Sequence, residues 1–155
     1  MYHDLYCAYN KALFKYKRKE NYWRWYKCIP MTKIILSSYR LGVLRTQELE
    51  SLNSSISKTK DKEKLARYRA DVKNIEEQKK KYKKKAEKCI KKLNLSEEEK
   101  QMAKLYYMEA KTWQMAFDNS IYQTLSEKRC SDEEFVQKLY EASRKKIQRA
   151  VNENF

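Results

Sequence analysis

The residues whose spacing suggests chemistry most directly are lysines. Nine lysines lie between Lys79 and Lys92, and five lysines from Lys73 onward are separated by steps of seven, four, four and three residues. On a helix, such steps align side chains in one row. The row consists of Lys73, Lys80, Lys84, Lys88 and Lys91. Each phosphate that an ammonium group neutralises adds about one unit to the salt dependence of binding. The row predicts nucleic-acid contact, with a solvated outer helix face as the alternative.

A second group of basic and polar residues near the C-terminus is predicted to bind nucleic acid. It comprises Gln137, Lys138, Arg144, Lys145, Lys146 and Arg149. The net charge of +15 attracts polyanions, which makes nucleic acid the leading class of partner, with DNA favoured over RNA. An anionic membrane surface is a weaker alternative, because the apolar stripes are narrow and are expected to face a core.

The sequence has few of the residues that a catalytic site or a metal site would need. The four cysteines, Cys7, Cys28, Cys89 and Cys130, lack the close pairing that a metal site needs, and His3 is the only histidine. We therefore expect no metal site and no cofactor, and we expect that the protein is not an enzyme. The cysteines are typical of small buried residues in a reducing compartment.

The elements that position these residues are expected to be helices. The chain has one glycine and one proline, whereas hairpins and sandwiches need such residues at defined turn positions. An all-α fold follows. No apolar run is long enough for a membrane span, and the first residues lack a signal-peptide pattern. We expect a soluble protein of the cytoplasm or nucleoid, with an organellar complex as the alternative.

Three segments are expected along the chain. Residues 1–30 form an aromatic amphipathic helix followed by an aromatic cluster at residues 22–26, which packs as a small core or, alternatively, stacks bases. Residues 31–94 form a long antiparallel helical hairpin that turns near residues 57–61 and contains the long basic helix. Residues 95–155 form a C-terminal helical region.

The basic helix has an apolar seam at steps of three and four for four heptads. The seam consists of Leu65, Tyr68, Val72, Ile75, Lys79, Tyr82, Ala86, Cys89 and Leu93. Together with the preceding helix, it predicts one core along the hairpin, which would be the most protected part of the protein. That core would contain Leu52, Ile56, Leu65, Val72 and Ile75.

Two capping boxes predict helix starts in the C-terminal region. The first pairs Ser96 with Glu99, and the second pairs Ser131 with Glu134. Residues following each serine are expected to form a helix whose first turn is acidic.

Residues 95–151 resemble the helix-turn-helix end of phage late-operon transcription regulators of the ArpU/RinA type, which look like region 4 of sigma factors. The matching residues are Leu95, Ser96, Glu99, Lys100, Leu105, Tyr106, Tyr107, Thr112, Trp113, Ala116, Ser131, Val136, Arg144, Lys145, Lys146 and Ile147. In that family, the stretch matching residues 105–113 spans the support helix and the start of the scaffold helix, and the matching serine caps the recognition helix. The resemblance implies a three-helix, helix-turn-helix-like bundle and DNA as the partner.

Two functions follow from these observations. The first is a DNA-binding transcription regulator of phage or mobile-element type, with the basic residues on phosphates. The second is a basic all-helical assembly subunit of a larger protein or ribonucleoprotein complex. The thirteen tyrosines and three tryptophans favour this alternative, because one small core does not readily bury so many, and both residue types are enriched at interfaces. The oligomeric state is left open.

Overall fold

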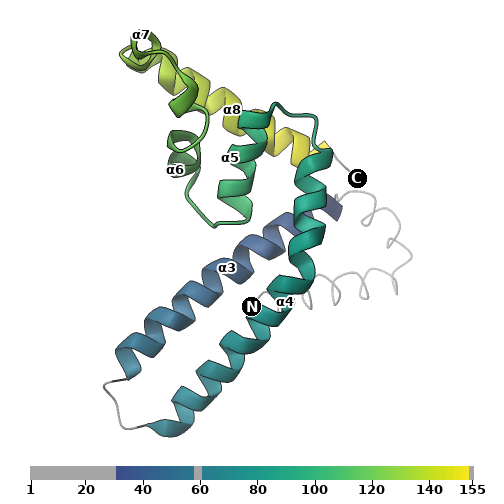
Figure 1. Ribbon diagram of the computed structural model, residues 1–155, viewed down its shortest axis with the longest axis vertical. Coiled ribbons are helices and arrows are strands. Elements are labelled where there is room, and N and C mark those ends of the chain that lie inside the picture. The colour runs from purple at the N-terminus through teal and green to yellow at the C-terminus, as the bar shows by residue number, and fades with distance from the viewer. Residues whose placement is uncertain (1–30, 58–60, 154–155) are drawn as a thin grey trace, which may run out of the picture.

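The computed structural model describes residues 31–57 and 61–153, and the described residues confirm the predicted all-α fold. Two long antiparallel helices, α3 (Met31–Ile56) and α4 (Lys62–Lys92), form the hairpin. The C-terminal elements are α5 (Glu97–Tyr107), α6 (Trp113–Asp118), the 3-10 helix η1 (Tyr122–Thr124), α7 (Glu127–Cys130) and α8 (Glu133–Glu153). Figure 1 shows these elements gathered at the end of the hairpin opposite its turn. The predicted aromatic helix and aromatic cluster of residues 1–30 lie outside the described residues.

The turn of the hairpin occupies the predicted interval. α3 ends at Ile56 and α4 begins at Lys62, with Asp61 as the N-cap residue. The Asp61 carboxylate accepts a hydrogen bond from the Lys64 backbone N–H at 3.4 Å. An acidic cap satisfies an otherwise unpaired amide and also opposes the positive end of the helix dipole, so this residue favours a helix start here.

The predicted seam is the face of α4 that packs toward α3. All nine of its residues are buried or half-buried. Lys79, the one charged member, is half-buried, which a lysine tolerates because its methylene stem packs while its ammonium group reaches water. The period of three and four therefore identified the packed face correctly.

The tight core, however, does not extend along the outer hairpin. Of the five residues expected in it, only Ile75 is buried, and Leu52 is 43% exposed. The remaining three, Ile56, Leu65 and Val72, are half-buried. This prediction is wrong because two packed helices bury only the residues on the line of contact between them. The residues on either side of that line stay partly open to water.

The core lies instead at the base of the hairpin, where a third layer closes the seam. There, α5 contacts both hairpin helices, and α8 contacts α3, α5 and α6. Phe117 and Ile147 are fully buried in this layer. The cluster of buried residues contains Leu36, Tyr39, Val43, Ala86, Ile90, Leu93, Met102, Ala103, Leu105, Tyr107, Met108, Ala116, Phe117, Ile121, Ile147 and Val151.

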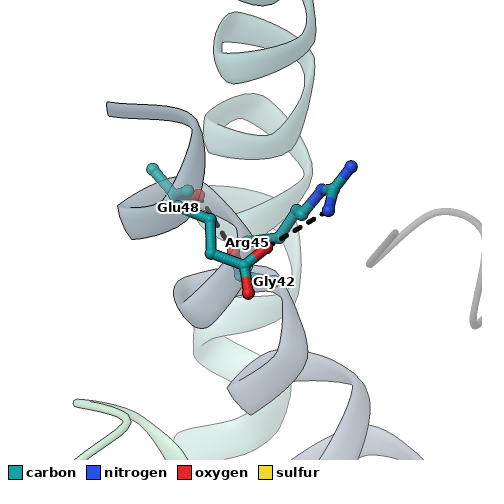
Figure 2. A network of polar contacts seen from close by, with 4 residues as sticks. Gly42, Arg45 and Glu48 are labelled. Atoms are coloured by element: carbon teal, nitrogen blue, oxygen red, sulfur yellow. Dashed lines mark hydrogen bonds and ion pairs between the residues drawn. The ribbon is translucent and has the colours of Figure 1, made fainter. Parts of the chain in front are cut away.

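A polar residue in the α3 seam is satisfied within its own helix. Thr46 is buried, and its hydroxyl donates to the Gly42 carbonyl oxygen at 2.9 Å. Figure 2 shows this part of α3 together with the neighbouring ion pair between Arg45 and Glu48, at 3.1 Å. Because the hydroxyl keeps a hydrogen bond, burying Thr46 costs little.

The two predicted capping boxes have different outcomes. The Ser96 hydroxyl accepts from the Glu99 backbone N–H at 3.3 Å, so the first helix start is confirmed. The second start is wrong by one residue, because Asp132 accepts from the Phe135 N–H at 3.1 Å. Ser131 instead ends α7, and its hydroxyl donates to the Lys128 carbonyl oxygen at 2.8 Å.

Arg40 of α3 holds the turn between α5 and α6. Its Nη1 donates to the carbonyl oxygens of Tyr106 and Lys111 at 2.6 and 2.8 Å. Its guanidinium also lies 3.9 Å from the Tyr106 ring centroid, and that ring stacks on Trp113 at 3.7 Å. A cation over an aromatic face is attracted to it, so one side chain joins the hairpin to the C-terminal layer by two kinds of contact.

The turn after α5 requires a left-handed residue, and Ala110 occupies that position with φ of 54°. The Lys111 N–H reaches back to the Leu105 carbonyl oxygen at 3.1 Å, which closes the helix end. An alanine in this region is strained by about 1–2 kcal/mol because its Cβ approaches the following carbonyl oxygen.

Changing Ala110→Gly is expected to raise the free energy of unfolding by about 0.5–1 kcal/mol, because relief of the strain exceeds the added freedom of the unfolded chain. Urea denaturation measures this difference. The matched control is Ala142→Gly, in the exposed middle of α8, which is expected to lower stability by about 0.5–1 kcal/mol. Destabilisation of similar size in both variants would contradict the strain at Ala110.

Candidate nucleic-acid interface

The structure places all five predicted lysines of the basic helix on the outer face of α4. We call this set, Lys73, Lys80, Lys84, Lys88 and Lys91, the α4 row. Every member is exposed. Helix geometry accounts for this position: residues two apart are about 200° apart around the axis, so a lysine two residues from a buried residue points outward. Lys88, for example, is two residues from both Ala86 and Ile90, which are buried.

No member of the α4 row forms an ion pair with an acidic residue in the described part of the chain. The ion pairs found there involve Arg45, Lys64, Lys100, Lys138 and Lys146. Glu77 is exposed and lies in line with the row, four residues after Lys73 and three before Lys80, so it offsets part of the charge there. From Lys80 to Lys91, the α4 row is a strip of positive charge without ion pairs.

The acidic residue within the densest lysine stretch lies on the flank toward α3. Glu87 is half-buried, and its carboxylate acts on Tyr39 of α3. Burial raises the pKa of Tyr39, and the negative charge of Glu87 raises it further. Glu87 therefore relieves the charge of the α4 row less than its place in the sequence suggests.

Two lysines beside the row contact an aromatic ring rather than solvent alone. The ammonium groups of Lys81 and Lys85 lie 5.8 and 5.0 Å from the centroid of the Tyr82 ring. These contacts hold the stems of both lysines against the flank of α4.

The six predicted residues of the C-terminal helix do not form one surface. Lys138 pairs with Glu134 at 2.8 Å, and the Gln137 amide donates to Glu141 at 3.3 Å. Both predicted residues are exposed, but both are engaged within α8. They are available to a ligand only in competition with acids of the same helix.

Lys146 and Arg144 have structural roles. Lys146 bonds Glu99 of α5 at 2.8 Å; the Glu99 side chain is only 15% exposed. The second carboxylate oxygen of Glu99 is buried and has no hydrogen-bond partner in the described residues. Arg144 is half-buried, with its guanidinium 5.7 Å from the centroid of the Tyr140 ring.

The remaining two residues, Lys145 and Arg149, we call the α8 pair. Both are exposed, and neither forms an ion pair within residues 31–57 and 61–153. Of the predicted C-terminal residues, these two therefore present unpaired cations on the surface. The sequence could not separate them from Lys146, because the acid that engages Lys146 lies 47 positions away in the chain.

The C-terminal region, which the resemblance predicts to be helix-turn-helix-like, has α5, α6 and α8 as its principal helices. Residues 119–132 join α6 to α8 and contain η1 and α7. A helix-turn-helix motif joins its helices by a turn of three or four residues, so this connection is longer.

Tyr107, at the end of α5, is buried in the core of this region. Burial raises the pKa of its phenol to about 12; Tyr106 also raises this pKa, and the charge of Arg40 lowers it. The phenol is therefore neutral.

Other kinds of site find no support in the described residues. No group of three or more His, Cys, Asp or Glu side chains there is placed to hold a metal ion. Burial raises the pKa of the Cys89 thiol, against the opposing effects of Thr32 and Lys92, as expected for a packed cysteine. His3, Cys7 and Cys28 lie outside the described residues. None of the described helices combines the length and apolar character that a membrane span requires.

Comparison with protein-family models, curated proteins and solved structures finds no match to this chain.

The different environments of two adjacent lysines lead to a prediction about stability. Lys146→Gln is expected to lower the free energy of unfolding by about 1 kcal/mol, because it leaves the largely buried Glu99 carboxylate without its cation. Lys145→Gln, the matched control one residue away, is expected to change it by less than about 0.5 kcal/mol. Urea denaturation of both variants compares them, and equal effects would show that the ion pair contributes nothing to stability.

Proposed function

We propose that this protein binds duplex nucleic acid, and DNA in particular, through phosphate contacts along the α4 row. The observation that carries the proposal is the row itself: five exposed lysines on one helix face, without acidic partners in the described part of the chain. Elsewhere on the described surface, several lysines lie beside a carboxylate. The α4 row is where an external polyanion would compensate the most charge.

The length of the row suits a polymer of phosphates. Lys73 and Lys91 are eighteen residues apart, which corresponds to about 27 Å along the helix axis. Duplex DNA carries about one charge per 1.7 Å of its axis, so several phosphates lie within reach of such a row. A single small anion would meet only one or two of its ammonium groups.

The energetics also favour a polyanion over simple solvation. Like charges four residues apart on a helix destabilise it by about 0.2–0.5 kcal/mol per pair. Lys80, Lys84 and Lys88 form two such pairs in succession. A bound phosphate backbone would remove this repulsion and release its own counterions, so both partners would gain.

The resemblance of residues 95–151 to phage late-operon regulators supports DNA as the nucleic acid and a regulator of phage or mobile-element type as the biological role. In that role, α8 would be the recognition helix, and Gln137 and Lys138 would be its exposed polar residues. The acidic first turn of α8, with Glu133 and Glu134, would repel phosphates at the groove. The proposal therefore assigns the affinity to the α4 row rather than to base contacts by α8.

Salt dependence tests this proposal. Fluorescence anisotropy of a labelled duplex is measured at several salt concentrations between 50 and roughly 200 mM, the range over which phosphate contacts lose most affinity. Changing Lys80, Lys84, Lys88 and Lys91 together to Gln is expected to make the slope of log affinity against log salt shallower by about three to four units. Circular dichroism checks that the helices persist.

The matched control removes four charges outside the row. Lys33, Lys62, Lys104 and Lys128 are exposed residues of α3, the start of α4, α5 and α7. Their change to Gln lowers the net charge equally and is expected to alter the slope by less than about one unit. Equal effects of the two quadruple variants would reduce the proposal to attraction by net charge, and no duplex binding by the unmodified protein at 50 mM salt would refute it.

An assembly subunit is the second candidate, and a shallow apolar hollow on α3 favours it. The hollow is lined by Leu44, Gln47, Glu48, Ser51 and Leu52. Leu44 and Leu52 together give the hollow its apolar lining, and a contiguous apolar surface is one that a protein partner can cover. A strictly monomeric protein that binds duplex through the α4 row would count against this second function.

A further inference from the structure

We infer that the protein bridges two duplex segments, one on the α4 row and one on the α8 pair. The inference rests on the proposed phosphate binding and adds a second contact surface on another helix. It derives from the way the two helices share one core.

The cationic face of α4 lies opposite the part of the helix that enters the core. Lys84 and Lys88 are each two residues from Ala86, and Lys91 is two residues from Leu93. Ala86 is fully buried, and Leu93 is 3% exposed. A two-residue step rotates a side chain by about 200°, so these lysines point away from the core.

The α8 pair has the same relation to the core from a different helix. Lys145 is two residues from Ser143 and from Ile147, and Arg149 is two residues from Ile147 and from Val151. All three of these neighbours are buried. Lys145 and Arg149 therefore lie on the side of α8 opposite its packed face.

The buried residues of both helices belong to one cluster, which includes Ala86 and Leu93 from α4 and Ile147 and Val151 from α8. α4 packs against α3 and α5, while α8 packs against α3, α5, α6 and α7. Figure 1 shows α8 running across the base of the hairpin, at an angle to α4. Each cationic face is directed away from this shared core on its own helix, and the inference is that a straight duplex along the α4 row does not reach the α8 pair, which can then hold a second duplex.

The second surface is limited to the α8 pair because the other cations of α8 are engaged. Lys138 is 2.8 Å from Glu134, and Lys146 is 2.8 Å from Glu99. The second duplex is therefore expected to bind more weakly than the first and to be released first as salt rises.

A two-duplex capture experiment tests the inference. A biotinylated duplex is immobilised at 50 mM salt, the full-length protein is bound, and retention of a second, fluorescent duplex is measured. The unmodified protein is expected to retain it. Changing Lys145 and Arg149 together to Gln is expected to weaken retention of the second duplex by on the order of one hundredfold, while protein still binds the immobilised duplex.

The matched control changes Lys104 and Lys128 to Gln, which removes the same charge from exposed positions of α5 and α7. Retention is expected to be unchanged in this variant. Sedimentation of the protein alone establishes whether it is a monomer, because a dimer could hold two duplexes by another route.

The outcomes separate the inference from the function on which it rests. Duplex binding by the unmodified protein without retention of the second duplex overturns bridging and leaves the proposed function intact. Retention that survives loss of the α8 pair also overturns bridging by this surface. Failure of the unmodified protein to bind any duplex overturns the proposed function itself.

Discussion

Closure of the hairpin base by α5 and α8 is the constraint on which the rest of the structure depends. A pair of helices leaves the flanks of its seam open, and the outer hairpin shows this in the half-buried Ile56, Leu65 and Val72. At the base, the same two helices are covered by a third layer, and Leu36 and Ala86 become fully buried. Arg40 fastens that layer by donating to two carbonyl oxygens of the α5–α6 turn. The hairpin is thereby anchored at one end and projects at the other (Figure 1).

This arrangement also decides which charges are available to a partner. A helix that buries one face in a shared core must present the residues of its opposite face to solvent, and no member of the α4 row forms an ion pair in the described residues. On α8, the same packing brings Lys146 beside Glu99 of α5 and removes it from the cationic surface. Burial and charge are thus linked. Of the basic residues of α8, the packing of the C-terminal layer leaves only the α8 pair exposed and without an ion pair in the described residues.

The sequence predicted the features that depend on local spacing. The helical class, the turn near residues 57–61, the packed face of α4 and its exposed lysine row all follow from periodicity and turn chemistry. It failed where contacts between distant segments decide the outcome. The location of the core depends on which part of the seam the C-terminal helices cover, and periodicity along α4 is the same in both parts. The Lys146–Glu99 pair and the role of Arg40 likewise join residues far apart in the chain. The resemblance to phage regulators stays a prediction, and the cap at Asp132 was missed because α7 occupies the residues just before it.

The most direct test of the account is the reactivity of individual lysines with an acylating reagent, measured by mass spectrometry with and without a bound duplex. Folded protein alone is expected to react at the α4 row and at exposed lysines elsewhere. On addition of duplex, Lys80, Lys84, Lys88 and Lys91 are expected to become protected, while Lys33, Lys104 and Lys128 stay reactive. Protection of those three control lysines while the α4 row stays reactive would contradict the account, because phosphate contact would then lie on a surface other than the outer face of α4.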